Sequence, residues 1–262
     1  MASADHRIPR RPESPEQERS ATSSQWMTEL ERSPESALVL FPQSQSRDQS
    51  NHRSELSDQH NSVPGRDFGL ALMDLASLKV PNSVRRRLAE YALPLLTSNL
   101  ASWPDDVPAR QGQGYAFWLL DRKAEALAAF EQTLEAAPKR EEVLVYAAAV
   151  AAQSGQTDLA IKLWRRALEV NPWLPRSHHE LAKLLALDHQ WKEALSQIEK
   201  SVDLDPFQLE SHLLKIECHL ELGQMEQARK ELDDLSRLSP EKAPTLNRWF
   251  EERKARTGIK DR

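Results

Sequence analysis

Hydrophobic and polar positions along most of this chain follow the spacing of amphipathic helices. In stretches such as 114–138 and 181–206, apolar residues return every three or four positions and define one apolar face. The pattern also has a longer period, because four prolines stand 34 residues apart: Pro138, Pro172, Pro206 and Pro240. A fixed period of this size indicates a stacked array of helical units rather than a single globular core.

Two further sets of positions keep the same register. An alanine lies twelve residues before each of these marker prolines: Ala126, Ala160, Ala194 and Ala228. We expect the alanines where two helices cross closely, because a larger side chain would push the helices apart. A bulky residue follows four positions later and should fill the space toward the next unit: Phe130, Trp164, Ile198 and Leu232.

A 34-residue unit with this alanine and a terminal proline resembles the tetratricopeptide repeat family. The resemblance implies an all-α solenoid of helix pairs and covers about half of the chain, as four repeats over 107–240. The turn inside each repeat carries Gly155 and Gly223 in two units, but Asp121 and His189 in the other two. The array is therefore regular in period and irregular at this turn.

The flanking segments have other patterns. Residues 1–65 are predicted to be a mostly disordered tail, since Leu56 is the only apolar residue in 43–62 and ordering the backbone costs roughly 1–2 kcal/mol per residue. Within this tail, the apolar stretch 37–41 (ALVLF) is interpreted as a weakly docking peptide. Residues 66–106 are predicted to form an irregular helix pair, and 241–262 a capping helix and tail.

Composition excludes several classes of function. The formal net charge of −5 argues against a general nucleic-acid binder. The single cysteine, Cys218, rules out a disulfide framework and the CxxC zinc and CxxCH haem motifs. No apolar run reaches the roughly 18 residues of a membrane span. The start lacks the apolar segment of a secretory signal, so a cytoplasmic protein is expected, or a periplasmic one if an exported upstream segment is missing.

Candidate catalytic chemistry is sparse. No nucleophile, base and orienting acid stand in a recognisable arrangement, so we predict a protein that is not an enzyme and needs no cofactor. Gly112 and Gly114 form a lone GxG without a preceding strand, which does not favour a phosphate site. The densest group of metal-ligand types lacks a standard zinc spacing, and we expect no metal there: His178, His179, His212, Cys218 and His219.

The family resemblance points to a groove. In tetratricopeptide proteins the first helix of each repeat lines a concave face that presents side chains to a peptide or protein. Carried onto this sequence, these positions are Tyr115 and Trp118, then Glu142, Val145 and Ala149, then Arg176, His179 and Lys183, and finally Glu210, Leu213 and Glu217. The basic set favours an acidic partner segment, while the family's Lys/Asn clamp for a terminal carboxylate is absent. For the charged residues, an ordinary solvated surface is the alternative.

A second resemblance concerns the start of the chain. Residues 5–13 (DHRIPRRPE), with ALVLFP and RDFGLALMDLA further on, are similar to segments of bacterial multihaem cytochrome c proteins with C-terminal tetratricopeptide repeats. This implies an alternative function, as the C-terminal part of an electron-transfer protein, in which His6 would be the one residue with a haem-ligand role. The favoured hypothesis is a non-catalytic interaction module, because the sequence contains no CxxCH motif to attach a haem.

Overall fold

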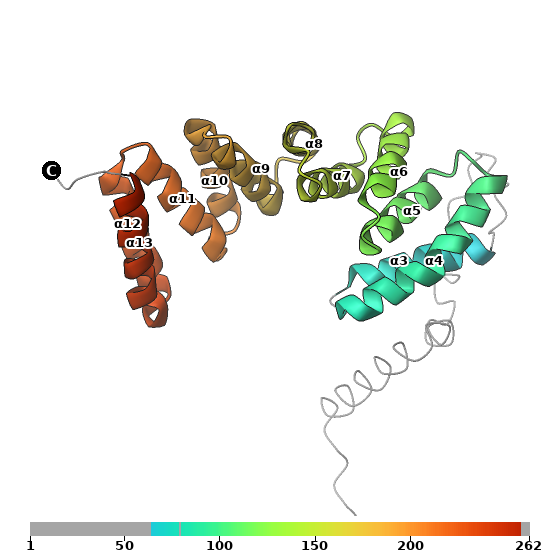
Figure 1. The fold of residues 1–262 in the computed structure, drawn as a ribbon, viewed down its shortest axis with the longest axis horizontal. Coiled ribbons are helices and arrows are strands. Elements are labelled where there is room, and N and C mark those ends of the chain that lie inside the picture. Colours follow the sequence, from blue (N-terminus) through green and yellow to red (C-terminus); the bar gives the residue numbers. More distant parts are fainter. Residues whose placement is uncertain (1–63, 79, 258–262) are drawn as a thin grey trace, which may run out of the picture. The chain divides into compact units, whose positions relative to one another are not determined.

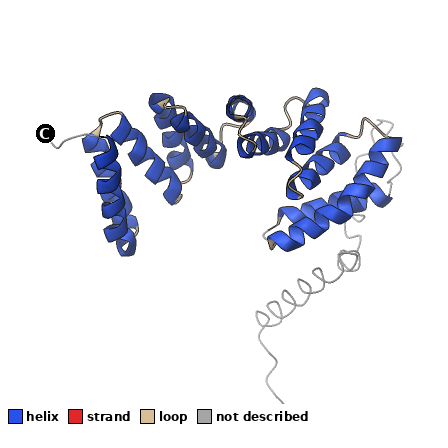
Figure 2. Cartoon of the chain, in the orientation of Figure 1, coloured by secondary structure: helices blue, strands red, loops and turns tan. Residues whose placement is uncertain are grey.

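The structure is a computed structural model that describes residues 64–78 and 80–257. None of these residues forms a strand, and Figure 2 shows helices joined by short loops. The predicted tail, including its 37–41 stretch, lies outside the described residues except for its last two positions. The chain divides into two compact units, Met1–Leu120 and Asp121–Arg262. The boundary falls in the turn inside the first expected repeat, and the division at 66–106 and 107–240 stays a prediction.

The first unit contains three helices that pack on one another: α3 (Pro64–Ser77), α4 (Asn82–Ser102) and α5 (Val107–Leu119) (Figure 1). Leu96 of α4 is fully buried at their meeting point. A Cβ atom added to Gly69 of α3 would come within 3.0 Å of the Leu96 side chain, and one added to Gly112 of α5 within 3.2 Å. The two glycines therefore allow α3 and α5 to approach α4 closely, which explains Gly112 without a phosphate.

Asp106 joins all three helices of this unit. It is the N-cap of α5, and its Oδ1 accepts a hydrogen bond from the Ala109 amide at 3.0 Å. Its Oδ2 accepts bonds from Arg66 Nε of α3 at 2.5 Å and from Asn99 Nδ2 of α4 at 3.0 Å. Burial alone would raise the pKa of Asp106, but these donors outweigh it and hold the pKa below its ordinary value.

The second unit is a row of antiparallel helix pairs (Figure 1). Its helices alternate between 14 and 13 residues: α6 (Lys123–Ala136), α7 (Glu141–Gln153), α8 (Thr157–Val170), α9 (Pro175–Leu187), α10 (Trp191–Leu204), α11 (Leu209–Glu221) and α12 (Met225–Leu238). Counting α5, first and second helices each begin at intervals of 34 residues. The predicted all-α solenoid of helix pairs is confirmed.

The turn inside each repeat has the same backbone form whatever its residue. Gly155 and Gly223 have φ angles of +74° and +72°, and the non-glycine residues Asp121 and His189 have +62° and +57°. All four lie in the left-handed region, which costs a side-chain-bearing residue roughly 1–2 kcal/mol. The repeat geometry therefore imposes the turn, and two of the four units accept local strain to keep it.

The four repeat alanines and the bulky residues after them are buried in the array. Ala126, Ala160, Ala194 and Ala228 are fully buried. The marker prolines each lie two residues beyond the end of a second helix, and Pro240 begins a short 3-10 turn, η2 (Pro240–Lys242). Turns after a helix suit proline, because proline cannot continue the helical hydrogen-bond ladder.

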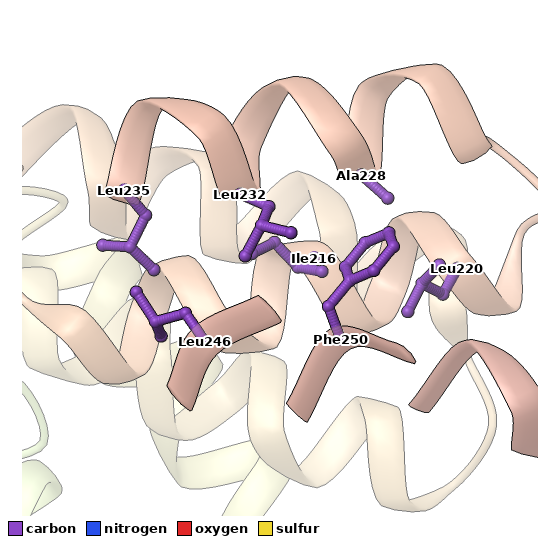
Figure 3. Close-up of a cluster of buried hydrophobic side chains, with 7 residues drawn as sticks. All are labelled: Ile216, Leu220, Ala228, Leu232, Leu235, Leu246 and Phe250. Atoms are coloured by element: carbon purple, nitrogen blue, oxygen red, sulfur yellow. The ribbon is translucent and has the colours of Figure 1, made fainter. Parts of the chain in front are cut away.

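The last helix, α13 (Ala243–Thr257), covers the end of the array. Its Leu246 and Phe250 close an apolar cluster, shown in Figure 3, whose other members come from α11 and α12: Ile216, Leu220, Ala228, Leu232 and Leu235. Arg229 lies over the Phe250 ring at 4.7 Å, and exposed Arg248 and Glu252 are on the outer side of α13. A polar outer face on an end helix keeps the packing surface of the last repeat out of water.

Candidate functional site

The exposed face of the first helices is the candidate site, and α9 is its most distinctive part. Four residues of α9 at spacings of three and four share one helix face: Arg176, Glu180, Lys183 and Leu187. Arg176 and Lys183 are exposed, and Lys183 donates to the half-buried Glu180 carboxylate. Leu187 is 71% exposed. We call these four residues the α9 stripe, which combines basic charge with an accessible apolar side chain.

His179 lies next to the stripe but is buried, with 9% exposure. Its Nδ1 is 3.0 Å from Ser211 Oγ of α11, which is 3.0 Å from Ser201 Oγ of α10. The hydroxyl proton of Ser201 is donated to the Pro175 carbonyl oxygen, so in the bond between the two serines Ser211 is the donor. Because that bond uses the only hydroxyl proton of Ser211, His179 Nδ1–H must donate to Ser211. Burial lowers the pKa of His179, which suits this neutral tautomer. The ring thus joins three helices and leaves little surface for a partner.

Tyr115 and Trp118 belong to the first unit. Tyr115 is 8% exposed, its hydroxyl donates to the Ala76 carbonyl oxygen at 3.5 Å, and its ring meets Trp118 edge-on with centroids 5.8 Å apart. Burial raises the pKa of Tyr115. Trp118 is half-buried. These two residues form a packing pair on α5, and they lie in a different compact unit from the other predicted groove residues.

The acidic groove residues have differing surroundings. Glu142 on α7 and Glu210 on α11 are exposed. Glu217 on α11 is half-buried and pairs with Arg253 of α13 at 3.1 Å, so it also fastens the capping helix. Helices α9 and α11 are in contact, so the α9 stripe and the two glutamates of α11 belong to neighbouring first helices.

Two histidines at equivalent repeat positions make buried polar pairs. His178 Nε2 is 3.1 Å from the Pro172 carbonyl oxygen, and its Nδ1 is 2.8 Å from Gln197 Oε1. One repeat later, His212 bonds the Pro206 carbonyl oxygen at 2.9 Å and Glu231 Oε1 at 2.5 Å. These side chains join the helices of one repeat, and the described residues contain no group of three or more that could hold a metal ion.

The electrostatics of the fourth repeat differ from those of the third. Glu231 also pairs with Lys215 Nζ at 2.7 Å. Burial opposes ionisation of Glu231, but its bonds to His212 and Lys215 outweigh burial and lower its pKa to about 2. The bond to Glu231 raises the pKa of His212 despite burial. Because an ionised carboxylate and a carbonyl oxygen both accept hydrogen bonds, both ring nitrogens of His212 carry protons.

Sequence reasoning missed the three most exposed large apolar side chains of the described residues. Leu187 is on the α9 stripe, and Trp173 and Phe207 lie in the turns between repeats. The sequence contained a signal for Trp173 and Phe207, because each directly follows a marker proline and the two are one period apart.

No described helix is both long enough and apolar enough to cross a membrane.

The fold defines a helical repeat protein, and comparison with known proteins specifies the kind of repeat. The family model of anaphase-promoting complex, cyclosome, subunit 3 matches residues 153–235. MamA AMB-1 is 20% identical, with 68% of this chain and 91% of that chain covered and a TM-score of 0.60. YrrB, a TPR protein with an unusual peptide-binding site, is 21% identical over 70% of this chain and 89% of its own, with a TM-score of 0.59.

A third solved structure, MamA from Desulfovibrio magneticus RS-1, is 19% identical over 67% of this chain and 97% of that one, with a TM-score of 0.56. No curated protein matches the chain. The described helices therefore have the tetratricopeptide repeat fold, as the 34-residue period predicted. The cytochrome resemblance stays a hypothesis; of its segments, RDFGLALMDLA lies in α3, whereas His6 is outside the described residues.

Proposed function

We propose that this protein is a non-catalytic interaction module that binds a partner peptide or protein on the face of its first helices. The observation that carries the proposal is the α9 stripe, where two exposed cations and an accessible leucine share one helix face. Interfaces of this kind combine an apolar anchor with charges that select and orient the partner. YrrB, which has the same fold, has a peptide-binding site, and this supports a peptide as the ligand class.

The charges favour an acidic partner segment with an apolar residue. Arg176 takes part in none of the ion pairs of the described residues, so its guanidinium is available for a bidentate contact with a carboxylate. Lys183 already donates to the Glu180 carboxylate, so it would contribute less than Arg176 to binding an acidic partner. Glu210 on the neighbouring α11 would repel an acidic segment that extended across it, so the partner's negative charge is expected over α9.

The test begins with an unbiased peptide display library selected on the immobilised full chain. Selected peptides should be rich in Asp and Glu beside an apolar residue. Their affinity, measured by calorimetry, should fall about tenfold for Arg176→Glu and for Leu187→Asp, because each removes a central contact. Lys200→Glu on the second helix α10 is the matched control and should leave affinity within about twofold.

Affinity should also weaken as salt rises, since screening shortens the reach of exposed charges. Circular dichroism must show that each variant keeps its helicity. Equal affinity of wild type and both stripe variants would exclude the first-helix face as the binding surface.

A further inference from the structure

Two large aromatic side chains are exposed at the turns that join one repeat to the next. Trp173, between α8 and α9, is 74% exposed, and Phe207, between α10 and α11, is 86% exposed. They are 34 residues apart and therefore occupy equivalent repeat positions. We call these two residues, with Pro172 and Pro206, the aromatic edge. Large apolar side chains that are exposed at recurring positions indicate an interaction surface.

The backbone holds both aromatic residues in place. The Trp173 amide donates to Asn171 Oδ1 at 2.9 Å, and the Phe207 amide donates to Asp205 Oδ1 at 3.2 Å. Each turn therefore has the same side-chain-to-backbone bond, accepted by the residue before its proline. A fixed backbone lowers the entropy lost when a partner immobilises the rings, so the edge is preorganised for binding.

The helices that follow the two turns carry opposite charges at equivalent positions. Three residues after each aromatic residue, α9 has Arg176 and α11 has Glu210. Both side chains are exposed, and neither takes part in an ion pair of the described residues. The aromatic edge therefore has an available cation beside Trp173 and an available carboxylate beside Phe207.

We propose that the aromatic edge binds the aromatic edge of a second copy of this chain, in a contact with two-fold symmetry. A two-fold axis that lies in the contact plane, midway between the two turns, exchanges their equivalent positions. Trp173 of one copy then faces Phe207 of the other. Arg176 of one copy likewise faces Glu210 of the other, and the symmetry forms each pair twice. This self-complementary charge selects a second copy as the occupant.

Two further acidic residues are brought together by the same axis. Glu169 near the end of α8 and Asp203 near the end of α10 are exposed and occupy equivalent positions. Each has a basic residue three positions earlier on its own helix, Arg166 or Lys200. Side chains three residues apart on a helix are neighbours, so each cation offsets the repulsion locally. We therefore expect the charge preference of the contact to come from Arg176 and Glu210.

A head-to-tail contact between copies uses the same residues less fully. If the second copy were shifted by one repeat without a two-fold axis, Trp173 would still meet Phe207 and Arg176 would still meet Glu210. Each pair would then form only once per contact, and the contact would continue into an open filament. The two-fold arrangement satisfies both charges of each copy in a closed dimer.

This inference goes beyond the proposed function, because it concerns the turns between repeats and a second copy of the chain. The aromatic edge and the α9 stripe meet at Arg176, so an acidic segment bound to the stripe should compete with the second copy. Leu187, at the other end of α9, belongs to the stripe alone. Variants of Leu187 and of the two aromatic residues therefore separate the two proposals.

The test is sedimentation velocity of the full chain over a range of concentrations, with circular dichroism to verify the helicity of each variant. The wild type should show a monomer–dimer equilibrium. Trp173→Ser with Phe207→Ser should raise the Kd of the dimer about tenfold or more, because both rings are lost from each copy. Leu187→Asp should leave this Kd within about twofold, although it weakens binding of a peptide to the stripe.

Charge reversal then tests which residues face each other. Arg176→Glu alone or Glu210→Arg alone should raise the Kd about tenfold, because each change sets like charges opposite one another twice. An equimolar mixture of these two variants should form a dimer with one chain of each kind, within about threefold of the wild-type Kd, because every pair of positions 176 and 210 again has opposite charges. Lys162→Glu, exposed on α8, is the matched control and should leave the Kd within about twofold.

Four results would overturn the proposal. The first two are a chain that stays monomeric at every concentration and a series of oligomers that grows beyond the dimer. The third is a dimer whose Kd is unchanged by the aromatic substitutions or by the single charge reversals. The fourth is a mixture of the two charge variants that associates no better than either variant alone.

Discussion

At the scale of single residues, the left-handed turn inside each repeat shows that backbone form takes precedence over residue preference. Gly155 adopts it without strain, and an added Cβ would meet no atom within 4 Å, so a substitution there changes backbone energy alone. His189 adopts the same form, and its ring contacts Trp191 edge-on at 5.8 Å. That contact offsets part of the cost of a non-glycine residue.

Gly155→Ala is therefore expected to destabilise the array by about 1 kcal/mol, the typical cost of a left-handed non-glycine residue. Chemical denaturation of the full chain measures the change in the free energy of unfolding. Gln156→Ala, at the next position and without a side-chain capping bond, is the control and should change it by less than about 0.5 kcal/mol. A Gly155→Ala midpoint equal to wild type would mean that the turn relaxes to another form.

The His212–Glu231 pair predicts a pH dependence of stability. The pKa of His212 is raised above its ordinary 6.5, so its contribution is complete below pH 6.5 and is lost as pH rises through the raised pKa. The pKa of Glu231 is lowered from 4.5 to about 2, so its contribution is present above pH 4.5 and is lost as pH falls toward 2. The pair therefore stabilises the fold most between pH 4.5 and 6.5.

Glu231→Gln converts this pair to the His–Gln pair of the third repeat. It should cost about 1–3 kcal/mol near pH 6 and less at pH 9, because His212 is neutral at the higher pH in both proteins. Urea denaturation across this pH range measures the difference. Asp233→Asn, exposed on the same helix, is the control. A loss that is the same at pH 6 and pH 9 would contradict an ionic pair.

At the scale of elements, helix length and turn position follow from the sequence because each marker recurs at one place in the unit. Ala160 is the fourth residue of α8 and is fully buried, as are its counterparts. The period could not predict how α5 packs. Val107 begins a helix in register with α7, yet α5 packs on α3 and α4. There Gly112, which belongs to no repeat pattern, lies against Leu96, which stands one period before Phe130.

Ala160→Leu should destabilise the array by about 1–3 kcal/mol, because a fully packed position must accept a larger side chain. The midpoint of chemical denaturation reports the change. Lys162→Ala, two residues further along the same helix and exposed, should shift the midpoint little. Similar shifts for the two variants would mean that the helix crossing has room for a larger residue.

The same limit explains why the burial of one candidate site residue could not be predicted. The family positions located Arg176, Lys183 and Glu210 on exposed helix surface, but they could not show that His179 is buried. Its ring is held by Ser211, 32 residues away, and this contact depends on a hydroxyl that no repeat marker requires. A repeat position gives the side of the helix, whereas the neighbours across the interface decide which side chains stay accessible.

At the scale of the whole molecule, stability of the repeat unit depends on contacts between neighbours. In such arrays the loss of an end contact acts locally and spreads only to adjacent repeats. Phe250 of α13 is fully buried against the last repeat and carries much of this end contact (Figure 3).

Phe250→Ala should cost about 3–5 kcal/mol and expose the end of the array. Hydrogen exchange should show faster opening of α11 and α12, with α7 and α8 protected as in wild type. Arg248→Ala, on the outer side of α13, is the control. Uniform loss of protection across α6–α12 would mean that the unit opens as one cooperative body.

The constant helix lengths have a consequence for how such a chain can grow or shrink. Because each repeat begins and ends at the same point of a 34-residue frame, duplicating the codons for 141–174 would insert one whole helix pair without changing the phase of any other. Most internal repeats would accept a new neighbour, since the alanine and the bulky residue meet at the same places. Duplicating the fourth repeat would leave one of the two copies of Glu217 without its Arg253 partner, because α13 supplies a single Arg253. Duplication of an earlier repeat would instead leave the end contact with α13 unchanged.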